Sequence, residues 1–211
     1  IDGDEALVLD RSQAYIGVLI DDLITKGTNE PYRMMTSRCE YRLSLRQDNA
    51  DIRLTQIGHY IGLASDDRLA RMVDRRTRID EERNRLEKLM ITPTEETNTF
   101  LEGVGSAPLK TGLTKAELLR RPELDYLTLA PLDPDRQDLP KTVYTEVETQ
   151  IKYEGYIKKQ EQQINQFKKL ENRKLDIDDY NKIKSLKVEA IQKLNAIKPE
   201  SVGQASRICG V

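Results

Sequence analysis

Apolar residues recur at helical spacing along most of the chain, with polar residues between them. Between residues 12 and 23 they would form one broad face, and Ser12 is placed to cap the helix. Between residues 66 and 90 they recur every seven residues, after a serine and two aspartates that suit the positive end of a helix. A third such pattern runs from about residue 142 to 173. The apolar face of the first helix would consist of Tyr15, Ile16, Leu19, Ile20 and Leu23.

The pattern predicts a mainly α-helical fold of long amphipathic helices, in which residues 6–9 could form the remnant of a short strand. Prolines divide residues 91–141 into short helices and turns, and Thr114 with Glu117 forms a predicted capping box. Beyond Asp178 the pattern predicts three short helices, the last capped by Ser201. We therefore expect three regions: a junction over 1–65, a long helix with its connector over 66–140, and a long helix with a docking module over 141–211.

Residues 30–46 concentrate arginine in one stretch. A helix capped at Thr36 or Ser37 would place Arg38, Arg42 and Arg46 on one face, about 6 Å apart along its axis. No aspartate or glutamate lies three or four residues from any of them, so the helix would leave its arginines without local partners. Such a stripe suits the phosphates of a nucleic acid. The alternative is that carboxylates of distant segments pair with it, and spacing alone does not decide between the two.

Composition narrows the function classes. Charged residues make up 33% of the chain but the net charge is only −2, so a nucleic-acid surface would have to be a local patch. Two cysteines and one histidine exclude a disulfide framework and a histidine-based zinc site within this chain. There is no apolar run long enough to cross a bilayer and no signal peptide, so we expect a cytoplasmic protein. No Gly-x-Gly-x-x-Gly follows a strand pattern, so no dinucleotide fingerprint is present.

Several runs of residues resemble the GidA (MnmG) family and occur in that family's order. They include Tyr15-Ile16-Gly17-Val18-Leu19-Ile20-Asp21-Asp22, Glu30-Pro31-Tyr32-Arg33-Met34, Thr36-Ser37-Arg38, Glu40-Tyr41-Arg42-Leu43, Lys152-Tyr153-Glu154-Gly155-Tyr156-Ile157 and Gly203-Gln204-Ala205-Ser206-Arg207-Ile208. The sequence departs from the family at Met35, Cys39 and Cys209, where the family tends to have Phe, Ala and Ser. Because the chain begins without Met and stops just after a helical pattern, we expect it to be a carboxy-terminal piece of a longer protein.

The resemblance implies a flavin-dependent enzyme that modifies carbon 5 of the tRNA wobble uridine by carboxymethylaminomethyl or aminomethyl addition. It also implies FAD, NADH and a folate one-carbon donor as cofactors, a GTPase partner (MnmE), and a homodimer. FAD would be held by an amino-terminal portion outside this chain. We therefore expect no catalytic, cofactor-binding or metal-binding residue here, and a region that binds tRNA and the partner. The alternative is a non-enzymatic helical scaffold that binds only protein partners.

Two groups of residues are the candidate contacts. The predicted phosphate contacts are Arg33, Arg38, Arg42, Arg46 and Arg53. The predicted docking residues, for partner or tRNA, are Lys152, Tyr153, Gly155, Tyr156, Lys159, Gln204 and Arg207. Aromatic rings among cations can stack on RNA bases, and a mid-helix glycine suggests that something approaches the backbone closely. The favoured alternative is that the two tyrosines pack in a groove between helices.

Asp21 and Asp22 form an adjacent pair of carboxylates that could suggest acid–base or metal chemistry. Adjacent residues of a helix point about 100° apart, so the two cannot readily share a ligand. We therefore expect both to be solvated charges near the end of a helix.

Overall fold

The computed structural model describes residues 6–211 and is mainly helical, which confirms the predicted fold class. Contacts along the chain divide it into two compact units. The first unit combines the residues up to 46 with residues 158–211, and the second comprises residues 47–157. These boundaries differ from the expected ones at 65 and 140, because the first unit joins residues from both ends of the chain.

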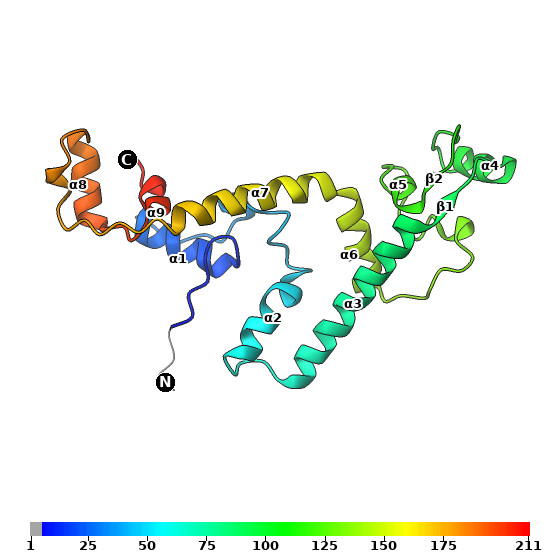
Figure 1. Cartoon of the computed structure of the whole chain (residues 1–211), viewed down its shortest axis with the longest axis horizontal. Helices are drawn as coiled ribbons and strands as arrows, with labels where there is room; N and C mark the ends of the chain where they lie inside the picture. The colour runs from blue at the N-terminus through cyan, green and yellow to red at the C-terminus, as the bar shows by residue number, and fades with distance from the viewer. Residues whose placement is uncertain (1–5) are drawn as a thin grey trace. The chain divides into compact units, whose positions relative to one another are not determined.

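The first unit packs helix α1 (Tyr15–Thr25) against helix α7 (Glu154–Glu171), most of which belongs to this unit (Figure 1). The turn η1 (Thr36–Arg38) follows α1 in the chain. The main apolar cluster of the unit joins Val18 of α1 to Cys39, Tyr41 and Leu45, and Phe167 of α7 packs against them. The rings of Tyr41 and Phe167 meet edge to face with centroids 6.1 Å apart. The segment from Cys39 to Leu45 is therefore held by this cluster.

The end of the chain forms a small helical module in the first unit. It contains η3 (Tyr180–Lys182), α8 (Val188–Ile197) and α9 (Val202–Arg207) around a core of Tyr180, Leu194, Ala205 and Ile208. The Ser201 hydroxyl accepts a hydrogen bond from the Gln204 N–H, which confirms the predicted cap. The first two predicted helices are less accurate, because one is a single 3₁₀ turn and the other begins at Val188 rather than Ser185.

The second unit is organised around the long helix α3 (Asp66–Lys88), which packs against α2 (Ala50–Tyr60), α5 (Lys115–Leu119) and α6 (Lys141–Lys152). The seven-residue repeat is confirmed, since Met72, Ile79 and Leu86 are all buried. Strands β1 (Met90–Ile91) and β2 (Leu113–Thr114) pair antiparallel on either side of α4 (Glu95–Gly103), and the single turn η2 (Ala130–Leu132) precedes α6. The predicted capping box of Thr114 and Glu117 is present at the start of α5.

A buried ionic cluster fixes the connector of the second unit to α3. Arg85 bridges Glu82 and Asp133, and Lys115 donates to Asp133 at 2.5 Å. The Tyr126 hydroxyl donates to Glu82 at 2.8 Å. Two acids and two bases make the cluster neutral, and each carboxylate is hydrogen-bonded, as burial of charge requires.

Two expected elements are corrected. The helix expected over residues 142–173 is interrupted at Tyr153, which separates α6 from α7. Residues 6–9 form no strand, and the start of the expected junction, residues 1–5, lies outside the described residues.

Candidate nucleic-acid interface

Helix α1 turns most of its predicted apolar face outward, although Tyr15 of that face packs against the buried cluster of the first unit. The buried residues of the helix are Gly17, Val18, Asp22 and Thr25, whereas Ile16, Ile20 and Leu23 are 40–50% exposed. The helix starts at Tyr15 and its cap is Ala14, because both the N–H and the hydroxyl of Ser12 bond to the Asp10 carboxylate instead. The polar face of the helix therefore faces the interior of the first unit.

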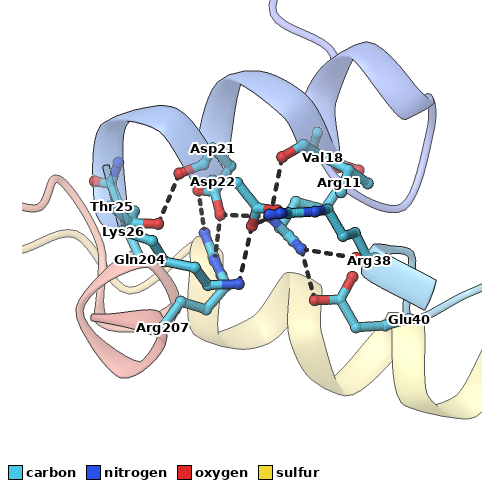
Figure 2. A network of polar contacts seen from close by, with 12 residues as sticks. Arg11, Val18, Asp21, Asp22, Thr25, Lys26, Arg38, Glu40, Gln204 and Arg207 are labelled. Atoms are coloured by element: carbon cyan, nitrogen blue, oxygen red, sulfur yellow. Dashed lines mark hydrogen bonds and ion pairs between the residues drawn. The ribbon is translucent and has the colours of Figure 1, made fainter. Parts of the chain in front are cut away.

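Arg11 organises this polar face (Figure 2). Its side chain is 2% exposed and donates to Asp22 at 2.7 Å, to Asp21 at 3.0 Å and to Glu40 at 2.7 Å. It also donates to the main-chain carbonyls of Val18 and Arg38. The expectation that Asp21 and Asp22 are solvated is therefore wrong. Sequence reasoning missed Arg11, although one signal was available: it is the only arginine or lysine before Lys26, in a segment rich in acids.

Asp22 remains ionised in this buried position. Burial by itself would raise the pKa of its carboxyl, but hydrogen bonds from Tyr32, Lys26 and Arg11 outweigh that effect and lower the pKa to about 2. The Tyr32 hydroxyl donates to it at 2.7 Å. Asp22 thus attaches the start of the arginine stretch to α1.

Residues 39–45 form turns rather than the predicted helix, which corrects the arginine stripe. Cys39 and Tyr41 are buried while Glu40 and Arg42 between and after them are exposed. This alternation has a period of two, so Cys39 and Tyr41 could not both be buried beside Val18 if the segment were helical. The arginines are therefore displayed by an irregular segment fixed on its other side by buried residues.

Arg33 and Arg42 are exposed and, within residues 6–211, have no hydrogen bond or ion pair. Arg42 stays near the Tyr15 hydroxyl, whose pKa is raised chiefly by burial and lowered slightly by this positive charge. The segment that carries Arg42 is anchored to α7, because Ser44 donates to the side chain of Gln160 through both its N–H and its hydroxyl, at 3.2 Å. Arg42 thus projects from an anchored backbone, and neither arginine has a counterion among the described residues.

The other predicted phosphate contacts are engaged to different degrees. Arg38 lies over the Tyr32 ring, 4.4 Å from its centroid, and 4.0 Å from the Asp22 carboxylate, with 37% of its side chain exposed. Arg46 donates to the Leu43 carbonyl at 2.7 Å and is half-buried. Arg53 lies on α2 in the second unit, where its Nε donates to Asn49. The structure therefore places Arg33, Arg38, Arg42 and Arg46 in one unit and Arg53 in the other.

The predicted docking residues near the helix break differ in availability. Lys152 is paired with Glu148 at 3.0 Å and donates to the Leu124 carbonyl, so its charge is used internally. Tyr153 and Tyr156 are 45% and 65% exposed with ring centroids 6.5 Å apart. The favoured alternative, packing in a groove between helices, therefore fails for these tyrosines. A Cβ on Gly155 would meet nothing within 4 Å, so no close approach explains the glycine within the described chain.

The remaining docking candidates lie in the first unit. Lys159 is exposed, whereas Gln204 is half-buried and accepts from the Glu200 N–H at 2.7 Å. Arg207 is 14% exposed and pairs with Asp21 at 2.7 Å (Figure 2). It also pairs with Glu171 at 2.5 Å and lies over the Phe167 ring. Burial alone would lower the pKa of Arg207, but Asp21 and Glu171 raise it. Arg207 therefore connects α9 to α1 and α7.

Positive charge accumulates over residues 158–211. This segment contains twelve lysines and arginines against seven aspartates and glutamates, although the whole chain is slightly acidic. Nine of these cations are exposed and form no ion pair with any described carboxylate. They are Lys159, Lys168, Lys169, Arg173, Lys174, Lys182, Lys184, Lys187 and Lys198. The unit that carries Arg33 and Arg42 is therefore also the unit with the local excess of positive charge.

The described residues offer little for a cofactor or a metal. The only strands within residues 6–211 are the two-residue antiparallel pair β1 and β2, so no strand–helix–strand unit is present to hold a dinucleotide. Among the same residues no group of three or more histidine, cysteine, aspartate or glutamate side chains could hold a metal ion. None of the described helices combines the length and apolar character that a membrane crossing requires.

Comparison with known proteins identifies the family. Residues 66–161 match the "tRNA modifying enzyme MnmG/GidA C-terminal helical domain", and residues 163–211 match the corresponding "C-terminal helical bundle". The tRNA uridine 5-carboxymethylaminomethyl modification enzymes MnmG of Finegoldia magna and Bacillus subtilis are 64% and 51% identical to the chain over 99% of its length. The chain spans only about a third of the length of these relatives, 34% and 33%.

Solved structures agree with this assignment. Aquifex aeolicus GidA is 36% identical over 99% of the chain in two crystal forms, with TM-scores of 0.79 and 0.76. The chain covers 33% and 31% of those two chains. The agreement thus extends over nearly all of the sequence and over its folded structure. The chain belongs to the MnmG/GidA family of tRNA modifying enzymes and corresponds to that family's C-terminal region.

Proposed function

We propose that this chain is the tRNA-binding and partner-binding part of a flavin-dependent enzyme that modifies carbon 5 of the wobble uridine. FAD, NADH and the folate one-carbon donor would bind to the portion of the enzyme outside this chain, and the reaction would take place there. The GTPase partner (MnmE) and a homodimer belong to the same proposal. The described residues contribute positioning of the RNA rather than bond making.

The observation that carries the RNA part of the proposal is that Arg33 and Arg42 are unpaired among residues 6–211. Arg42 is exposed on a segment whose opposite side is packed into the first unit, and exposed Arg33 follows Tyr32, whose hydroxyl donates to Asp22. Guanidinium groups bind phosphates through paired N–H donors, and a fixed backbone reduces the entropy lost when they do so. Arg38, stacked on Tyr32 between them in sequence, supplies a third cation with a third of its surface still open.

Charge accumulation in the same unit supports a polyanionic partner. The exposed lysines of residues 158–211 add a broad field that would attract RNA before any specific contact forms. Tyr153 and Tyr156 present exposed aromatic rings that suit base stacking, so they remain proposed contacts. Gln204 and Arg207 are engaged inside the first unit, so any docking role for them would act through the placement of α9.

The test is tRNA binding by the full-length protein carrying Arg33→Ala and Arg42→Ala together. Each lost phosphate contact reduces the slope of log affinity against log salt by about one, so the double variant should have a slope shallower by about two. The matched control is Arg71→Ala with Arg78→Ala on α3. These arginines are also exposed but are paired with Asp67 and Asp74 at 2.9 Å, and the change in net charge is identical.

The control should keep the wild-type slope, and circular dichroism should show unchanged helix content in both double variants. An Arg33/Arg42 variant with the wild-type slope would remove the RNA role of this segment. A protein with little affinity for tRNA at any salt concentration would favour the alternative of a scaffold that binds only proteins.

A further inference from the structure

Six large aliphatic side chains are exposed together on α1 and the segment before it. They are Leu7, Val8, Ile16, Ile20, Leu23 and Ile24, with exposures between 40% and 80%. On α1 these side chains lie on the face opposite to the buried network of Arg11. A helix of a complete folded domain normally buries its apolar face. Contiguous apolar patches that stay on a protein surface mark contact sites.

The first unit cannot bury this face by rotating α1. A Cβ on Gly17 would lie 2.3 Å from the Asp10 carbonyl oxygen and 2.5 Å from that of Leu9, so the backbone there is in direct contact with the helix. Asp21 is held by Arg11 and Arg207, and Asp22 by Arg11 and Tyr32. Rotation would separate these buried charges from their partners, which costs several kcal/mol for each ion. The apolar face is therefore held outward.

A groove of about 430 Å³ continues this face within the first unit. Val8, Ile20 and Ile24 form its apolar side, and Phe167, Lys174 and Gln204 are among the residues that line it from α7, α9 and the chain between them. An occupant would therefore meet aliphatic side chains on one side and polar groups on the other. This composition fits a folded protein surface with an apolar centre and a polar edge.

We propose that the α1 face and this groove bind the amino-terminal portion of the same full-length polypeptide. The chain spans about a third of its relatives' length, and the matched C-terminal domains begin only at residue 66. In the sequence, helix α1 therefore precedes those domains, toward the remaining two thirds of the protein. A covalently attached segment reaches the face at high effective concentration, without the loss of translational freedom that a second molecule suffers. This proposal does not depend on RNA binding.

The test measures thiol labelling at residue 24 in Ile24→Cys, with Cys209→Ser, by mass spectrometry of the labelled peptide. Val188→Cys on α8 in the same background is the reference, because Val188 is 72% exposed in the same unit. In the 211-residue chain the two sites should label at similar rates. In the full-length protein the labelling rate of residue 24 relative to residue 188 should fall at least tenfold. Cys39, 2% exposed, should stay unlabelled in both proteins, which shows that the first unit is folded.

An unchanged ratio in the full-length protein would overturn the proposal. The proposal would also be overturned if residue 24 of the 211-residue chain were protected from labelling, relative to residue 188, as strongly as in the full-length protein, and more so at higher protein concentration. The occupant would then be a second copy of the chain. As an independent measurement, Ile20→Asp with Ile24→Asp should lower the melting temperature of the full-length protein. The same pair of substitutions should leave that of the 211-residue chain within 1–2 °C.

Discussion

Replacement of Gly17 by alanine tests why α1 faces the way it does. In an ordinary helix the change from glycine to alanine stabilises the fold by about 1 kcal/mol, because alanine loses less backbone entropy. Gly17 lies in the first turn of α1, where helix propensity alone still predicts a more stable protein. The contacts of its backbone predict the opposite sign.

The magnitude of the effect follows from how far the backbone must move to make room for a Cβ. The new Cβ would lie 2.3 Å from the Asp10 carbonyl oxygen, whereas real Cβ contacts rarely fall under 3.0 Å. The backbone of Leu9 and Asp10 must therefore move away by about 0.7 Å. That carbonyl already accepts hydrogen bonds from the N–H groups of Gln13 and Ala14, which the movement would weaken. Overpacking of this kind costs about 1–3 kcal/mol, so a net loss of up to about 2 kcal/mol remains after the helix preference of about 1 kcal/mol is subtracted.

Urea unfolding of the 211-residue chain measures the effect. With Cys209→Ser, Cys39 is the only thiol, and because it is buried in the first unit its labelling reports unfolding of that unit. Gly17→Ala should lower the midpoint, whereas Ile16→Ala, at a half-exposed position of the same helix, should change stability by less than about 0.5 kcal/mol. Gly58→Ala on α2, where a Cβ would lie 3.6 Å from Ala64, should raise the midpoint seen by circular dichroism. A Gly17→Ala variant as stable as the parent would refute the packing argument.

Two further predictions concern the buried charges. The folded pKa of Asp22 lies below its ordinary value of 3.8, so its contribution of about 2 kcal/mol is present above pH 4 and is lost as the pH falls toward 2. The stability difference between the parent and Asp22→Asn should therefore narrow over that range, and a constant difference would contradict the assignment. In the second unit, Tyr126→Phe removes the 2.8 Å hydrogen bond to Glu82 and should cost about 1–2 kcal/mol in urea unfolding. A stability equal to that of the parent would show that Arg85 alone satisfies Glu82.

Features set by neighbouring residues could be predicted from the sequence. The seven-residue repeat of α3 correctly gave its buried positions at Met72, Ile79 and Leu86, because one helix face packs against several neighbours. The caps at Thr114 and Ser201 were also correct, because the hydroxyl of a cap residue accepts from an N–H three residues further on and needs no tertiary partner. The family resemblance was likewise confirmed, because it rests on runs of adjacent residues.

Features set by distant residues could not be predicted. The buried face of α1 depends on Arg207, which lies 186 positions from its partner Asp21, and on the backbone of Leu9 and Asp10. Hydrophobic periodicity assigned the aliphatic side of α1 to the interior because it cannot represent a buried ion network. The arginine segment failed for a similar reason. Its spacing suits a helix, but the space beside Val18 requires Cys39 and Tyr41 on the same side of the chain.

The same network explains why some arginines of the first unit are free and others are not. Arg11 and Arg207 occupy the carboxylates of Asp21, Asp22 and Glu171, and Arg11 also reaches Glu40, the acid closest in sequence to Arg42. A buried guanidinium must keep its partners because an unpaired charge there is costly, whereas an exposed one remains solvated without any. The buried arginines therefore hold these acids, and Arg33 and Arg42 form no ion pair with the carboxylates of residues 6–211. Loss of Arg11 should therefore free the carboxylates of Glu40 and Asp22. These carboxylates would then compete with an external anion for the exposed arginines.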